Sequence, residues 1–264
     1  MPVKIEFYKY HGNGNDFIIL DNRLNQIALD CPRIAFLCDR HFGIGADGLM
    51  LLESQSGFDF SLKYFNSDGN ESTMCGNGGR CITAFANELG IIKKKARFTA
   101  IDGYHEAEIL SKHAGQCIIR LKMKDTRPGQ EFEDGYFIDT GSPHFVKFVS
   151  DLAAVDVRAE GRSLRNDKRF APGGCNVNFV EITPAGISVR TYERGVENET
   201  LSCGTGVTAS ALITAFLNKS NARYYFVHTR GGEFKVHFHQ LASEFTEIYL
   251  EGPAAFVFKG EITI

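Results

Sequence analysis

Two stretches of the sequence share one unusual arrangement, a cysteine followed at once by a glycine-rich helix start. The first, NSDGNESTMCGNGGRC, spans residues 66–81 and contains Cys75. The second, YERGVENETLSCGTGVTAS, spans residues 192–210 and contains Cys203. After each cysteine, apolar side chains recur at helical spacing over roughly four turns. We therefore predict two long helices that begin at the cysteines and cover about residues 75–89 and 203–217.

The two cysteines also mark an internal repeat. They lie 128 residues apart, and the same shift aligns further identical residues at the helix start, on strands and in a turn. These pairs are Gly76 with Gly204, Gly78 with Gly206, Phe17 with Phe145, Glu53 with Glu181, Phe98 with Phe226, and Gly103 with Gly231. The pattern indicates two related halves in tandem, with a boundary near residues 125–134, where Pro128 and Gly129 lie.

Most of the remaining sequence consists of short runs in which apolar and polar residues alternate between turn-forming residues. Such runs are typical of strands, which we expect at 5–8, 17–20, 57–65, 97–101, 117–123, 186–192, 222–229, 233–238 and 247–250. A further helix is expected from Pro32 to His41, with the proline in its first turn. We predict an α/β (α+β) fold in which each half is a strand-rich sheet or barrel around one long helix.

Composition and charge exclude several classes of protein. The chain has 264 residues, a net charge of −3 and an apolar fraction of 43%. Its only basic run, Lys93–Lys95, does not form the basic face of a nucleic-acid-binding domain. No apolar stretch reaches the roughly 18 residues of a membrane span, and the first residues do not read as a secretory signal. The seven cysteines are therefore expected as reduced thiols in a soluble, cytoplasmic protein without nucleic-acid or membrane partners.

The cysteine turns suggest proton transfer at a carbon next to a carboxylate. Free N–H groups and the positive end of the helix dipole stabilise a thiolate at a helix start. Glycines after the cysteine let main-chain amides approach a carboxylate closely. If a pseudo-twofold axis relates the halves, the two turns face each other. One thiolate can then remove an α-proton while the opposing thiol returns one, which is epimerisation without a cofactor.

Six segments, in order along essentially the whole chain, resemble the diaminopimelate epimerase family. They are HGNGNDF (11–17), ADGLMLLE (46–53), NSDGNESTMCGNGGRC (66–81), GSPHFV (141–146), GGCNVNFVE (173–181) and TYERGVENETLSCGTG (191–206). The resemblance implies an isomerase that interconverts LL- and meso-diaminopimelate in lysine and peptidoglycan precursor biosynthesis. It implies two-base transfer of the α-proton, with no pyridoxal phosphate or other cofactor and no metal.

The resemblance also implies roles for particular residues. The base and acid, which exchange roles with the direction of the reaction, would be Cys75 and Cys203. The residues that tune the pKa values of these thiols would be His144 and Glu193. Main-chain amides that bind the reacting carboxylate would come from Gly76, Asn77, Gly204 and Thr205. The reacting amino end would be held by Asn15 and Glu193, and the distal end of the substrate by Asn66, Asn176 and Arg194, whose guanidinium suits a bidentate carboxylate contact.

The fold implied by the resemblance has two pseudo-symmetric halves, each a mixed β-barrel around a central helix, with the active site in the cleft between them. A last strand at 256–264 would return to the first half, so that the halves would be 1–126 plus 255–264, and 127–254. The partner would be a small-molecule substrate, and a possible homodimer is expected. Two positions depart from the family pattern: many members have Asn where this chain has Ser142, and some have Gln where it has Gly48. A substrate contact at either position would then be shortened, water-mediated or missing.

Other functions use the same residues differently. A proline racemase or hydroxyproline epimerase needs only a small ring pocket, which the set Asn66, Asn176 and Arg194 does not suit. A more distant isomerase of the same fold would lack the two cysteines, whereas this chain has both. A thiol redox or metal-binding protein would bind zinc or form a regulatory disulfide, but the sequence lacks tight cysteine pairs. We expect packing roles for Cys31, Cys38, Cys81 and Cys117, and at most a pocket-lining role for Cys175.

Overall fold

The computed structural model describes residues 4–218, 222–242 and 244–263, and it divides into two compact units. The first unit comprises residues 1–121 and 252–264, and the second comprises residues 122–251. We had expected the boundaries at 126/127 and 254/255. The difference arises because Met123 and Thr126 pair with the second unit, through backbone hydrogen bonds to Ile248 and Phe245.

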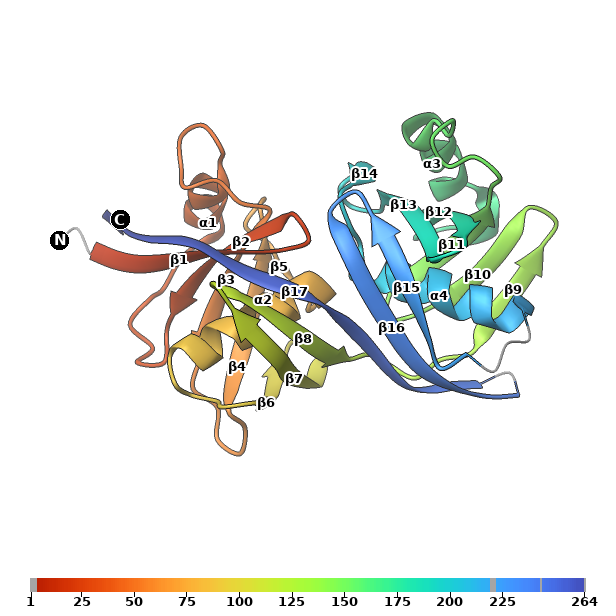
Figure 1. Cartoon of the computed structure of the whole chain (residues 1–264). Coiled ribbons are helices and arrows are strands. Elements are labelled where there is room, and N and C mark those ends of the chain that lie inside the picture. The colour runs from red at the N-terminus through yellow and green to blue at the C-terminus, as the bar shows by residue number, and fades with distance from the viewer. Residues whose placement is uncertain (1–3, 219–221, 243, 264) are drawn as a thin grey trace. The chain divides into compact units, whose positions relative to one another are not determined.

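The first unit is a closed β-barrel around one helix (Figure 1). Its hydrogen-bonded strands follow the circuit β1–β2–β3–β4–β6–β7–β8–β17 and back to β1. The bounds are β1 Lys4–Gly12, β2 Asn15–Asp21, α1 Cys31–Cys38, β3 Gly48–Glu53, β4 Phe60–Asn66, β5 Glu71–Ser72, α2 Gly76–Glu88, β6 Lys95–Ala100, β7 Gly103–His113 and β8 Gln116–Lys122. Helix α2 contacts strands from several sides, and all residues from Gly76 to Ala86 are buried. A helix that is buried all round must lie inside a core.

The second unit repeats this plan around helix α4. Its strands pair in the order β9–β10–β11–β12–β13–β15–β16–β17. The bounds are β9 Pro128–Phe132, β10 Gly135–Asp139, β11 Pro143–Phe148, α3 Val157–Arg165, the 3-10 turn Lys168–Phe170, β12 Asn176–Thr183, β13 Gly186–Glu193, β14 Asn198–Thr200, α4 Gly204–Asn218, β15 Tyr224–Thr229, β16 Gly232–Leu241 and β17 Glu244–Thr263. Helix α4 contacts strands from β9 to β16. The predicted fold class, mixed α/β with two barrel-like halves around central helices, is confirmed.

The predicted helices lie close to their expected positions. Helix α2 starts one residue after Cys75 and is followed by Gly90, whose φ of 72° is the left-handed conformation that ends many helices. Helix α4 likewise starts directly after Cys203. Helix α1 ends at Cys38 rather than at His41, because the next residue, Asp39, turns the chain by accepting bonds from the backbone N–H groups of His41 and Phe42.

Three expectations were wrong in detail. Cys31, expected to pack, is exposed at the start of α1, where its Sγ donates to the carbonyl of Asp68 at 3.3 Å. Phe226 is not the structural equivalent of Phe98: Phe98 is buried and pairs with β4, whereas in the second unit the pairing residue is Val227 and Phe226 is 43% exposed. The runs at 247–250 and 256–264, expected as separate strands, are both parts of β17, apart from Ile264, which lies outside the described residues.

Candidate active site

Cys75 occupies the N-cap position of α2 without acting as a side-chain cap. Its backbone is extended, with φ −87° and ψ 139°, and its carbonyl accepts the first helical hydrogen bond, from Gly79 N–H at 2.8 Å. Because the side chain does not cap the helix, the thiol points elsewhere, to Asn15. Cys75 Sγ lies 3.6 Å from Asn15 Oδ1, an oxygen that can only accept, so the thiol donates this hydrogen bond.

The side chain of Asn15 is held in one orientation from both ends. Its Nδ2 donates to Asp47 Oδ2 at 2.8 Å, and its Oδ1 accepts from Asn77 Nδ2 at 3.2 Å. Asn77 is itself fixed, because its own Oδ1 accepts from the guanidinium of Arg80 at 2.8 Å. Arginine can only donate hydrogen bonds, and a carboxylate can only accept them. Because Arg80 and Asp47 stand at the two ends of this chain, they determine which way the amides of Asn77 and Asn15 point. The oxygen of Asn15 is thereby aimed at Cys75.

Arg80 is a fully buried cation one turn into α2. Its guanidinium also donates to Asn13 Oδ1 at 2.8 Å and to the carbonyls of Gly76 and Pro253 at 3.2 Å each. Burial lowers the pKa of Arg80 to about 10, so it stays charged near neutral pH, and interactions with Cys81 and Cys75 favour its charge. The attraction is mutual, so Arg80 favours the thiolate of Cys75 while Asn15 accepts from the thiol.

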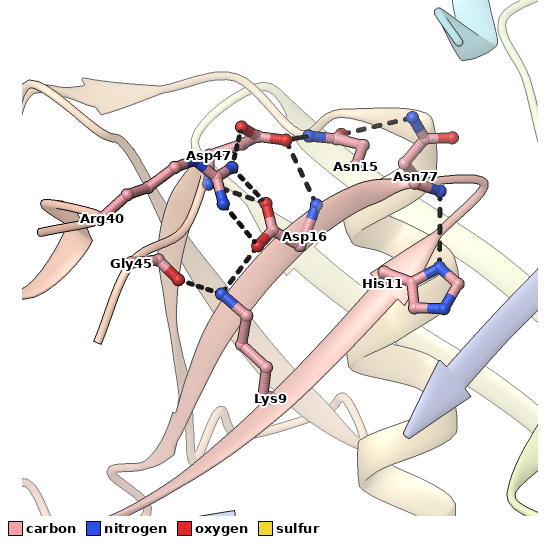
Figure 2. Close-up of polar contacts among 9 residues, drawn as sticks. Lys9, His11, Asn15, Asp16, Arg40, Gly45, Asp47 and Asn77 are labelled. Carbon is pink, nitrogen blue, oxygen red and sulfur yellow. Dashed lines mark hydrogen bonds and ion pairs between the residues drawn. The ribbon is translucent and has the colours of Figure 1, made fainter. Parts of the chain in front are cut away.

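A cluster of four charged side chains lies behind Asn15 (Figure 2). Asp16 accepts from Arg40 at 2.7 Å and pairs with the buried Lys9 at 2.8 Å, while Lys9 also donates to the carbonyl of Gly45. Arg40 spans the two carboxylates, since it also contacts Asp47 at 2.7 Å. Burial alone would raise the pKa of Asp16, but hydrogen bonds from Arg40 and Lys9 outweigh it and lower this pKa to about 2. The contact with Arg40 holds the carboxylate of Asp47 in place, and that carboxylate in turn orients the amide of Asn15.

Asp47→Ala should impair turnover far more than it impairs folding. The substitution frees Asn15 Nδ2 and lets its amide rotate away from Cys75, and a misaligned catalytic group can cost ten- to a hundredfold in rate. Asp47 is half exposed, so we expect the unfolding free energy to change by only about 1 kcal/mol. Steady-state kinetics and urea unfolding measure the two effects. Asp39→Ala, in the same loop but without a contact to Asn15, is the control, and equal kcat losses in both variants would contradict this role.

The structure accounts for one departure from the family, the glycine at position 48. A Cβ at Gly48 would lie 2.6 Å from the carbonyl of Phe65 and 2.6 Å from the ring of Tyr64. The ring of Tyr64 and the backbone of β4 therefore occupy the space that a larger side chain at this position needs. Asn66 ends the same strand and forms a turn with its backbone, bonding to Asn70 and Gly69.

The second cysteine turn has a different set of partners. Cys203 is 8% exposed, and its carbonyl accepts from Val207 N–H at 2.8 Å, as Cys75 does from Gly79. Cys203 Sγ lies 3.4 Å from Thr205 Oγ1, and Thr205 Oγ1 lies 2.9 Å from His144 Nε2. His144 is therefore linked to Cys203 through one hydroxyl. Burial, together with the charge of Arg194, lowers the pKa of His144 to about 3, so the imidazole is neutral.

The buried neutral His144 should make the protein sensitive to acid. Its pKa is about 3 in the folded chain and near 6.5 in the unfolded chain, so between these values the unfolded chain binds the extra proton. The unfolding free energy contributed by His144 is therefore fully present above pH 6.5 and is lost as the pH falls, with a limiting slope of about 1.4 kcal/mol per unit. Urea unfolding from pH 7 to pH 4.5 should show a steeper loss for the wild type than for His144→Gln. Parallel curves would contradict a buried neutral histidine.

The residues expected at the distal end of the substrate are in part brought together. Asn176 Oδ1 accepts from the backbone N–H of Arg194 at 2.8 Å, so these two lie side by side at the ends of β12 and β13. Asn176 Nδ2 donates to the carbonyl of Pro143 at 3.2 Å and to Ser142 Oγ at 2.9 Å. The carbonyl can only accept and the Arg194 N–H can only donate, so these two groups orient the amide and the serine adds a further contact. Glu193 accepts from Thr200 Oγ1 at 2.9 Å. Asn66 belongs to the first unit, as do Asn15, Cys75 and Asn77.

Three residues in the hydrogen-bond networks around the two cysteine turns were not predicted as functional: Arg80, Asp47 and Asn178. All three lie in the quoted motifs, but a motif does not reveal which side chains meet. The pairing of β2 with β3, with Phe17 opposite Gly48, brings Asp47 beside Asn15. Four of the remaining cysteines, Cys38, Cys81, Cys117 and Cys175, are buried.

Two further properties concern the described residues as a whole. Among them, no group of three or more His, Cys, Asp or Glu side chains is placed to hold a metal ion. Over the same ranges, no helix is long and apolar enough to cross a membrane.

Several solved structures have the same fold as this chain. A hydroxyproline epimerase from Agrobacterium vitis has a TM-score of 0.72 at 14% identity, covering 99% of this chain and 93% of that chain. A phenazine biosynthesis protein of the PhzF family from Bacillus anthracis has a TM-score of 0.76 at 16% identity, covering 99% and 100%. At these identities the likeness establishes the fold alone, which is that of a class containing racemases, epimerases and isomerases.

Sequence comparison identifies the family within that class. The family described as diaminopimelate epimerase matches residues 7–123 and 136–257. The diaminopimelate epimerase of Flavobacterium psychrophilum is 49% identical, covering 98% of this chain and 100% of that protein, and that of Chlorobaculum tepidum is 44% identical, covering 96% and 99%. The chain belongs to the diaminopimelate epimerase family, as its motifs indicated, and it is an isomerase.

Proposed function

We propose that this enzyme interconverts LL- and meso-diaminopimelate by a two-base mechanism in which Cys75 and Cys203 are the base and the acid. One thiolate removes the proton from one side of the α-carbon, and the other thiol delivers a proton to the opposite side, so the configuration inverts. The observation that carries this proposal is the matched setting of the two cysteines. Each directly precedes a buried helix, accepts that helix's first hydrogen bond with its carbonyl, and has its Sγ directed to a fixed polar group.

The acidity of the α-proton is the chemical obstacle, and the helix starts address it. Removing the proton places a second negative charge on the carboxylate, which preorganised donors must stabilise. The main-chain amides of Gly76, Asn77, Gly204 and Thr205 belong to the first turns of α2 and α4, where N–H groups lack helical acceptors. We assign the reacting carboxylate to these amides. No cofactor takes part in the mechanism that we propose.

The remaining contacts are assigned by chemistry. The reacting amino group is held by Asn15 and Glu193, since both offer oxygen acceptors. The distal end is held by Asn66, Asn176 and Arg194, and the side-by-side placement of the last two supports a shared contact with an amino acid head group. Ser142 contributes a hydrogen bond to Asn176. A proline racemase would leave this set without a role.

The biological setting belongs to the same proposal. We place the reaction in lysine and peptidoglycan precursor biosynthesis, in the cytoplasm, where seven cysteines without a disulfide would stay reduced. A homodimer is expected from the family resemblance, and sedimentation equilibrium tests it.

The deciding experiment is deuterium exchange at the α-carbon. The enzyme, with no pyridoxal phosphate added, is incubated in D₂O with LL-diaminopimelate, meso-diaminopimelate or proline, and exchange is followed by NMR. We expect exchange and epimerisation with both diaminopimelate isomers and none with proline. Exchange on proline alone would overturn the assignment. Loss of activity on adding a chelator would favour a metal-dependent reaction instead.

A further inference from the structure

A buried chain of hydrogen bonds leads from the interior of the second unit to Cys203. It starts at Thr191 on β13, passes through Asn178 on β12 and His144 on β11, and reaches Thr205 at the start of α4. Asn178 and His144 have no exposed surface, and Thr191 is only 3% exposed. Asn178 has no role in the mechanism described above.

The orientation of the Asn178 amide is determined by its neighbours. Nδ2 lies 3.2 Å from the carbonyl oxygen of Phe145, which can only accept, and Oδ1 lies 2.9 Å from the hydroxyl of Thr191. A reversed amide would set two acceptor oxygens against each other in a buried site, at a cost of about 1–3 kcal/mol. Nδ2 therefore points to Phe145, and it also lies 3.0 Å from His144 Nδ1.

The amide in turn determines the tautomer of His144. Because Asn178 Nδ2 is a donor, Nδ1 of the neutral imidazole must be the acceptor, and the ring proton resides on Nε2. Nε2 then donates to Thr205 Oγ1 at 2.9 Å. With one lone pair of Thr205 occupied in this way, its own hydroxyl proton is free to turn to Cys203 Sγ at 3.4 Å.

We propose that Asn178 is a positioning residue that fixes the Nε2–H tautomer of His144 and so makes the hydroxyl of Thr205 a donor to Cys203, which favours the thiolate. The tautomer follows from the geometry alone, whereas its value for catalysis rests on the proposed function of Cys203.

Gly206 supports this role of Asn178. A Cβ at position 206 would lie 2.3 Å from Asn178 Oδ1 and 3.3 Å from His144 Cε1. Only glycine lets the first turn of α4 pass this close to the pair. The second glycine of the CGTG turn thus serves the chain of hydrogen bonds, in addition to any freedom it gives the backbone near a carboxylate.

The tautomer can be read directly from the full-length enzyme. Long-range ¹H–¹⁵N correlation spectra distinguish protonated from unprotonated ring nitrogens, and His144→Gln assigns the His144 signals by their loss. We expect Nδ1 to be unprotonated and Nε2 to carry the proton at pH 7. A proton on Nδ1, or a charged ring, would overturn the proposal. This result does not depend on which substrate the enzyme uses, so it is distinct from failure of the exchange assay.

The effect on Cys203 is measured by alkylation. The rate of iodoacetamide labelling at each cysteine is followed against pH by mass spectrometry in the wild type, Thr205→Val, Thr205→Ser and Asn178→Ala. For Cys203 we expect the midpoint to rise by about one pH unit in Thr205→Val, the loss of one hydrogen bond to a charged group, and to return in Thr205→Ser. Asn178→Ala should move it in the same direction.

Cys75 is the internal reference, because its described partners lie in the first unit and none of these substitutions touches them. An unchanged midpoint for Cys203 in Thr205→Val would overturn the proposal. So would equal shifts for Cys203 and Cys75, because those would report a general loosening of the fold. If Asn178→Ala does not fold, the comparison of Thr205→Val with Thr205→Ser and the wild-type NMR spectrum still test the proposal.

Discussion

Replacing either Cys75 or Cys203 with serine should reduce the epimerisation of diaminopimelate by a thousandfold or more. A serine hydroxyl is far less acidic than a thiol, so it cannot form the anion that removes the α-proton near neutral pH, and general acid–base catalysis is commonly worth 10²–10⁴. The two substitutions should be comparably severe, because in a two-base reaction the proton must both leave and return. Epimerisation is measured by NMR in D₂O.

The control for this prediction is Cys31→Ser. Cys31 is exposed, and its Sγ donates to the carbonyl of Asp68, seven residues before Cys75. Serine can keep that contact, so activity should stay at the wild-type level. Circular dichroism would show whether the catalytic variants are folded. If Cys75→Ser or Cys203→Ser kept more than a tenth of the epimerisation rate, that cysteine would not be a base in the reaction.

Arg80→Met should damage both stability and catalysis. The substitution removes the donor to Asn13, Asn77 and the carbonyls of Gly76 and Pro253 while nearly conserving the length of the side chain. Buried acceptors left without a donor cost about 1–3 kcal/mol each, partly recovered as the two asparagines reorient, so we expect a loss of about 3 kcal/mol in the unfolding free energy. Once Asn77 can rotate, Asn15 loses its alignment with Cys75, and kcat should fall by about a hundredfold.

Arg80→Lys separates charge from geometry. Lysine keeps the positive charge that favours the Cys75 thiolate but cannot make the planar set of contacts that arginine makes. We expect it to recover part of the stability and less of the activity. Urea unfolding and steady-state kinetics measure both. Wild-type kcat in a folded Arg80→Met variant would show that the Arg80–Asn77–Asn15 chain does not align Cys75.

The parts of the fold that the sequence predicts well are those with a strong local signal. A glycine-rich turn followed by apolar residues at helical spacing placed α2 and α4 within a residue of their starts. Helix α3 was missed because it is mainly polar. Only Val157 and Gly161 are buried in it, and it is held where Gly161 packs against Tyr192. The middle of β17 was missed because Gly252 and Pro253 read as a break, yet both pair with β8 in the structure.

The candidate site shows the same limit. The motifs pointed to Cys75, Cys203, Asn15 and His144, but the directions of their hydrogen bonds depend on strands far apart in the sequence. Asp47 meets Asn15 only through the pairing of β2 with β3, and Asn178 meets His144 only through the parallel pairing of β11 with β12. Such pairings are set by packing over the whole barrel, which no local pattern encodes.

The long strand β17 determines the order in which the barrels can be completed during synthesis. Residues 244–251 finish the second unit, but the gap between β8 and β1 in the first unit is filled only by residues 252–263. Because synthesis runs from the N-terminus, every residue of the second unit is made before the segment that completes the first unit. Until then β1 and β8 present open edges, which a chaperone or the same segment from another copy could cover. The first unit is therefore synthesised first but completed last, by the twelve residues 252–263.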